Sequence, residues 1–187
     1  MTAPPSVPPR PGGATAVNSS RSAIPSHVSG PGHSRPRFPV AAVLADRLDD
    51  VPVVDAAIRL ADARGAPLLL IAVLPPLLPG AVPRPPDSAA VRAVVGRALP
   101  RVARAGVAHT PAVYHRPAGR AGRLGTAKGL LDVAVAYGCS VLVVSLSGPA
   151  ELDACTVMDA AAIRGGPLVR AASPVPWVPL VAPCPER

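Results

Sequence analysis

The sequence predicts a doubly wound α/β domain, in which a parallel sheet of five strands carries helices on both faces. Short, unbroken apolar runs alternate along the chain with segments of helical periodicity, and such runs are typical of strands buried on both faces. This alternation is the pattern of a parallel sheet with right-handed crossover connections. In addition, 49% of the 187 residues are apolar, which is too many for a wholly disordered chain.

The first strand and helix are predicted between residues 39 and 65. Residues 39–45 (PVAAVLA) form an apolar run without alternation, and an acidic turn follows them. Residues 53–64 are expected to form a helix, with Asp50 near its start and Gly65 just past its end. The apolar stripe of this helix consists of Val54, Ala57, Ile58 and Ala61.

The second strand is predicted at residues 67–73 (PLLLIAV), and a proline-rich loop at 74–86 follows it. Asp87 and Ser88 then begin a second helical segment, which Gly106 ends. Pro100 lies inside this segment. Proline lacks the N–H that a helix interior needs, so we expect the helix to kink or split there.

Five further elements complete the alternation. Pro111 predicts a place at the sheet edge for its strand, because proline cannot donate to a neighbouring strand. Pro176 and Pro179 interrupt the last predicted strand in the same way. In order, the elements are a strand at 107–114, a helix at 126–137, a strand at 141–146, an alanine-rich helix at 150–164 and a strand at 175–181.

The N-terminal segment is predicted to be a disordered arm rich in proline, arginine and serine. Nine of the 27 prolines lie in residues 1–39, and no acidic residue precedes Asp46. This composition cannot bury enough apolar surface to offset the entropy of ordering. We therefore expect an arm at 1–37, a folded domain at 38–182 and a short tail at 183–187.

Composition excludes several classes of function. Only 2% of the residues are aromatic, so a base-stacking surface for nucleic acid is not expected. No apolar run approaches the ~20 residues that a membrane-spanning helix requires. Three cysteines without a CxxC motif indicate neither a disulfide framework nor a zinc site. A cytoplasmic protein is the resulting expectation.

Three stretches resemble the universal stress protein family: FPVAAVLAD with VVDAAIRLADARGAPLLLIAVLPP, then LLDVAVAYGCSVLVVS, and finally LVRAASPVPWVPLV. The first is similar to the opening strand, helix and second strand of that family, and the second to its third helix and fourth strand. The last is similar to its final helix and final strand. The resemblance implies a flavodoxin-like, adenine-nucleotide α-hydrolase-like fold and a role in a stress response.

The resemblance also implies a nucleotide site. ATP-binding members use an Asp after the first strand and a G-x2-G-x9-G-[S/T] loop after the fourth, and Asp46 matches the first of these. The glycine motif is missing, since Gly148 is followed by Pro149 and Glu151. Pro149 removes an N–H donor, and Glu151 places negative charge where a triphosphate would lie. ATP or ADP binding in the family manner is therefore weakened.

Ser145, Ser147 and Gly148 remain candidates for contact with a smaller ligand, together with Asp46. Each has a structural alternative: a strand end and a helix cap for the first three, and a turn for Asp46. Residues 119–129 (GRAGRLGTAKG) are a further candidate for anion binding, but they lack the P-loop spacing, and a solvated loop is the alternative. The arginines that favour the anion are Arg116, Arg120 and Arg123.

No catalytic or metal-binding constellation is recognisable. His109 and His115 have no cysteine or carboxylate cluster near them in the sequence, and Cys139 is expected to be a buried apolar residue. The first hypothesis is a non-enzymatic regulatory module that binds a nucleotide or another small ligand weakly. The alternative is a ligand-free interaction domain that forms a homodimer or binds a protein partner. In the resembling family the last strand often pairs across a dimer, and Pro176 and Pro179 weaken that mode.

Overall fold

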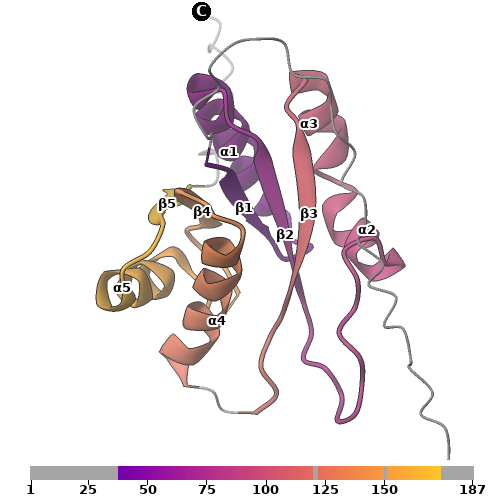
Figure 1. Ribbon diagram of the computed structural model, residues 1–187, viewed down its shortest axis with the longest axis vertical. Helices are drawn as coiled ribbons and strands as arrows, with labels where there is room; N and C mark the ends of the chain where they lie inside the picture. The colour runs from indigo at the N-terminus through magenta and orange to yellow at the C-terminus, as the bar shows by residue number, and fades with distance from the viewer. Residues whose placement is uncertain (1–37, 120–121, 150, 174–187) are drawn as a thin grey trace, which may run out of the picture. The chain divides into compact units, whose positions relative to one another are not determined.

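A single parallel sheet with the strand order β3-β2-β1-β4-β5 forms the centre of the fold (Figure 1). The computed structural model describes residues 38–119, 122–149 and 151–173. Every neighbouring pair of strands is parallel, as the sequence predicts. The strands are β1 (Val40–Leu44), β2 (Leu68–Leu74), β3 (His109–His115), β4 (Val141–Ser145) and β5 (Leu168–Ala172).

Helices cover both faces of the sheet, which confirms the doubly wound α/β fold. α1, α2 and α3 pack on one face, whereas α4 and α5 pack on the other. The helices are α1 (Asp50–Arg64), α2 (Ala89–Val95), α3 (Leu99–Ala105), α4 (Arg123–Ala136) and α5 (Ala154–Arg164).

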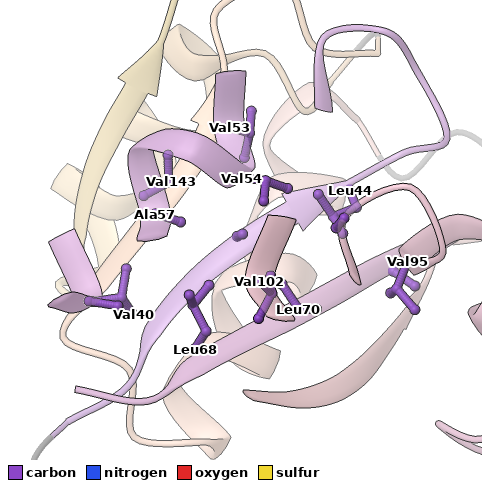
Figure 2. Close-up of a cluster of buried hydrophobic side chains, with 14 of the residues drawn as sticks. Val40, Leu44, Val53, Val54, Ala57, Leu68, Leu70, Val95, Val102 and Val143 are labelled. Atoms are coloured by element: carbon purple, nitrogen blue, oxygen red, sulfur yellow. The ribbon is translucent and has the colours of Figure 1, made fainter. Parts of the chain in front are cut away.

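Two aliphatic cores lie on the two faces of the sheet. Alternate residues of the strands point to opposite faces, so β1 contributes Val40 and Leu44 to one core and Ala41 and Val43 to the other. Figure 2 shows the first core, in which side chains of α1, α2 and α3 lie over β1, β2 and β4. Every residue of β1, β2 and β4 is buried, which explains their unbroken apolar sequences.

Pro100 and Pro111 have the effects on helix and strand that the sequence predicts. Pro100 is the second residue of α3, and α2 ends five residues before it at Val95. The predicted helix is therefore split, because a proline is tolerated in the first turn of a helix and not in its interior. Pro111 lies in β3, which is an edge strand.

The end of the sheet differs from the prediction. The resemblance assigns residues 168–172 to the last helix, but they form β5, paired with β4 in parallel. α5 ends at Arg164, and Gly165, Gly166 and Pro167 follow it, so the helix cannot continue. Arg170 interrupts the apolar run of β5, and three of its five residues are exposed, so the sequence lacks the unbroken apolar pattern of a strand that is buried on both faces.

Three predicted features lie outside the described residues: the arm at 1–37, the strand at 175–181 and the tail at 183–187. Among the described helices, none is long and apolar enough to cross a membrane.

Candidate functional site

The strand order reverses between β1 and β4. From β1 the chain runs outward through β2 to β3, and it then returns to β4 and β5 on the other side of β1. In open parallel sheets of this kind, ligands bind outside the carboxyl ends of the strands at such a switch point. Asp46 follows β1, and the segment from Leu146 to Asp153 follows β4, so the candidate residues gather at this edge.

Asp50 fixes the turn that carries Asp46. Its two carboxylate oxygens each accept a hydrogen bond from the N–H of Ala45 at 3.1 Å, and one of them also accepts from the N–H of Arg47 at 3.0 Å. Burial raises the pKa of the Asp50 carboxyl group, and the backbone donors of Ala45 and Arg47 oppose that rise. Asp46 is held in this turn at φ +57°, a conformation that Asp tolerates better than most residues.

Asp46 lines a groove at the switch point. The groove has a volume of about 340 Å³, and Pro75, Arg116 and Pro149 also line it. The Asp46 carboxylate lies 3.5 Å from the Arg97 guanidinium, and about half of its side chain (52%) is exposed. A carboxylate from the end of β1 and a guanidinium from the end of β3 therefore face one solvent-accessible space.

Ser145, Ser147 and Gly148 make contacts within their own loop. The buried Ser145 side chain accepts a hydrogen bond from the N–H of Ser147 at 3.2 Å, which closes the turn after β4. A Cβ atom at Gly148 would lie 2.5 Å from the carbonyl oxygen of Leu152, so only glycine fits there. None of these three lines the groove, whereas their neighbour Pro149 does.

Glu151 and its partners form a second polar cluster, which sequence reasoning missed. Glu151 lies at φ +73°, and its carboxylate accepts a hydrogen bond of 2.7 Å from the Thr126 hydroxyl in the first turns of α4. The carbonyl of Thr126 accepts a hydrogen bond of 2.6 Å from the buried Tyr114 hydroxyl. Burial raises the pKa of Tyr114 to about 12. No sequence motif announces this cluster, because its members come from three distant segments.

The other candidate residues are placed as follows. Cys139 is buried, as expected, and burial raises the pKa of its thiol to about 11. His115 bonds to the loop after β2, and the described residues contain no group of three or more metal-ligating side chains. Of the arginines in the candidate anion loop, Arg116 lines the groove and Arg120 lies outside the described residues.

The fold and the place of the groove define a doubly wound α/β protein with a candidate ligand site at its switch point. No protein-family model matches the chain, and no curated protein matches it either. Solved structures do match the chain. A protein of the universal stress protein family from Burkholderia pseudomallei is 22% identical, with a TM-score of 0.50, over 71% of this chain and 93% of that chain.

Two further matching structures contain nucleotides. A universal stress protein in complex with cAMP is 20% identical, with a TM-score of 0.50, over 73% of this chain and 97% of that one. The universal stress protein from Archaeoglobus fulgidus in complex with dAMP is 15% identical, with a TM-score of 0.51, over 72% of this chain and 96% of that one. The chain thus has the fold of the universal stress proteins and resembles them at low sequence identity.

Proposed function

We propose that the protein is a non-enzymatic regulatory module that binds a nucleoside monophosphate weakly in the groove at the switch point. The observation that carries this proposal is that Asp46 and Arg116 line one groove. A carboxylate accepts hydrogen bonds from sugar hydroxyls, and a guanidinium pairs with phosphate through two parallel bonds. The two side chains supply one partner for each polar half of a nucleotide.

The loop after β4 favours a single phosphate over a polyphosphate chain. Pro149 lines the groove and has no N–H to donate. The same loop carries the acidic residues Glu151 and Asp153, whose negative charge disfavours a polyphosphate more than a single phosphate. Arg97 is paired with Asp46 and does not line the groove, so among the described lining residues Arg116 is the cationic side chain that faces a phosphate. The volume of about 340 Å³ also lies near the lower end of the range of ~300–1,000 Å³ for small-molecule sites.

The solved structures support the proposal by analogy. The two nucleotides named in them, cAMP and dAMP, each carry one phosphate. By the same analogy we infer a role in a stress response. We also propose a cytoplasmic location, where such a nucleotide would be available.

A thermal-shift titration with AMP, cAMP, ADP and ATP tests the proposal. A ligand that binds only the native state raises the midpoint of unfolding as its concentration grows. We expect AMP and cAMP to raise it at millimolar concentration and ATP to raise it less. Asp46→Asn and Arg116→Gln should each remove the effect, whereas Asp159→Asn, on the exposed face of α5, should preserve it.

Absence of a shift with every nucleotide would exclude the proposed ligand class. If AMP shifts the midpoint equally in the wild type and in Asp46→Asn, the site lies elsewhere in the molecule.

A second candidate function is association with another chain through β5. This strand is at the edge of the sheet among the described residues, it contains no proline, and its first residue, Leu168, is half exposed. Unpaired N–H and C=O groups of an edge strand can pair with a strand of a second chain.

A further inference from the structure

A second groove lies next to the first, under the loop that joins β2 to α2. The imidazole of His115, the last residue of β3, bonds to this loop at two points. The N–H of Arg84 donates to Nε2 of His115 at 3.3 Å, so the ring proton lies on Nδ1, which bonds to the carbonyl oxygen of Pro75 at 3.1 Å. Figure 1 shows that the loop from β2 to α2 and the segment that follows β3 leave the sheet at the same end.

The groove is large and mostly apolar. Its volume is about 570 Å³, well inside the ~300–1,000 Å³ range of small-molecule sites. Of the ten lining residues within the described part of the chain, eight are apolar. The lining consists of Leu74, Pro75, Pro76, Leu77, Leu78, Ala81, Val82, Arg84, Ala90 and His115.

Two large apolar side chains of this lining are almost fully exposed. Leu78 is 78% exposed and Val82 is 82% exposed. The loop carries six prolines between residues 75 and 86, and each of them fixes its own φ angle. The backbone therefore has little freedom to fold these side chains inward. Leu78 and Val82 thus present apolar surface at the border of a groove that is itself mostly apolar.

The charged side chain in the lining of this groove is positive. Among the described residues that line it, Arg84 is the only permanently charged one, His115 is the only other ionisable one, and none is a carboxylate. Arg116, the next residue after His115, lines the adjoining groove. An apolar groove with a guanidinium at its border complements a ligand that has an apolar body and one negative group.

We propose that this groove binds an amphiphilic monoanion, such as a medium-chain carboxylic acid, separately from the nucleotide. The apolar body lies against Leu78 and Val82, and the carboxylate pairs with the Arg84 guanidinium. The described lining residues offer no carboxylate to sugar hydroxyls, whereas the first groove offers Asp46.

The test uses the full chain and the fluorescent anion anilinonaphthalene sulfonate as a probe. We expect the probe to bind saturably and its fluorescence to increase. Decanoate should displace the probe at a concentration at least about tenfold lower than decanol does, because the alcohol cannot form the charge-assisted hydrogen bond to the guanidinium. Arg84→Gln should weaken probe binding and decanoate competition about tenfold. This variant keeps the backbone N–H that bonds to His115.

Matched controls separate the groove from the rest of the surface. Val82→Ser should weaken probe binding several-fold, whereas Leu48→Ser should not, although Leu48 is an 84% exposed apolar residue outside the groove. Arg104→Gln removes an exposed arginine on α3 and should also have no effect. Circular dichroism and the unfolding midpoint verify that each variant is folded.

Three outcomes would overturn the proposal. They are non-saturable probe binding, equal losses in Leu48→Ser and Val82→Ser, and unchanged decanoate competition in folded Arg84→Gln. The nucleotide proposal fails or succeeds independently, because Asp46→Asn should abolish the shift by AMP and leave the dissociation constant of the probe unchanged. If Asp46→Asn weakens the probe as much as Arg84→Gln does, the two grooves are one site and this inference is wrong.

Discussion

Tyr114 connects β3 to α4 through a single hydrogen bond, and its ionisation should be visible in the stability of the protein. Its pKa is about 12 in the folded chain and ~10 in an unfolded chain. The unfolded state therefore loses the phenolic proton first as the pH rises. The protonated Tyr114 hydroxyl therefore contributes fully to the free energy of unfolding below pH ~10, and this contribution is lost as the pH rises toward about 12.

Spectrophotometric titration of the phenol groups checks this prediction. We expect one group with a midpoint near pH 12 and its disappearance in Tyr114→Phe. That variant also leaves the carbonyl of Thr126 without the bond shown here, so its free energy of unfolding should fall by about 1 kcal/mol. A Tyr114 that titrates near pH 10 would show that the hydroxyl is not buried as described.

Single residues also show where sequence reasoning ends. Asp46 lies in a turn, which is its structural alternative in the sequence. The helix cap expected among residues 145–148 is formed by Asp153 instead. Two sets of hydrogen bonds could not be predicted. In one, the Asp50 carboxylate accepts from the N–H groups of Ala45 and Arg47. In the other, the Glu151 carboxylate accepts from the Thr126 hydroxyl. These contacts depend on backbone angles and on long-range packing, neither of which has a signature in one sequence.

At the scale of elements, the start of α5 depends on one side chain. The carboxylate of Asp153 accepts hydrogen bonds from the N–H of Thr156 at 3.0 Å and from its hydroxyl at 2.7 Å. An N-cap of this kind contributes about 1 kcal/mol. Asp153→Ala should lower the free energy of unfolding by about that amount in urea denaturation, and Asp159→Ala in the same helix should leave it nearly unchanged. Equal effects of the two substitutions would contradict the capping role.

The elements that the sequence predicts best are those buried on both faces. β1, β2 and β4 have unbroken apolar sequences, since every side chain meets a helix on one face or the other. The split at Pro100 also follows from backbone chemistry alone. β5 was missed because its residues alternate irregularly between buried and exposed, and because the prolines after it resemble those that flank a final strand.

For the whole molecule, the edge at β5 leads to a prediction about association. If a second chain pairs with this edge, light scattering should give a molar mass twice that of one chain, with a monomer fraction that grows on dilution. Leu168→Lys should shift the equilibrium toward the monomer, because a charged side chain blocks edge pairing. Leu48→Lys should not shift it, and a strictly monomeric wild type would exclude this candidate function.

The composition of the two cores determines how the folded protein would react with an oxidant. Among the described residues, the buried apolar side chains are Val, Leu, Ile and Ala with only Tyr114 and Cys139 added, and Met158 and Cys155 lie at the surface. The thiol of Cys139 is kept protonated by its raised pKa, and the protonated thiol is the unreactive form. Peroxide would therefore modify the surface sulfur atoms first and leave the interior that holds the sheet together chemically unchanged.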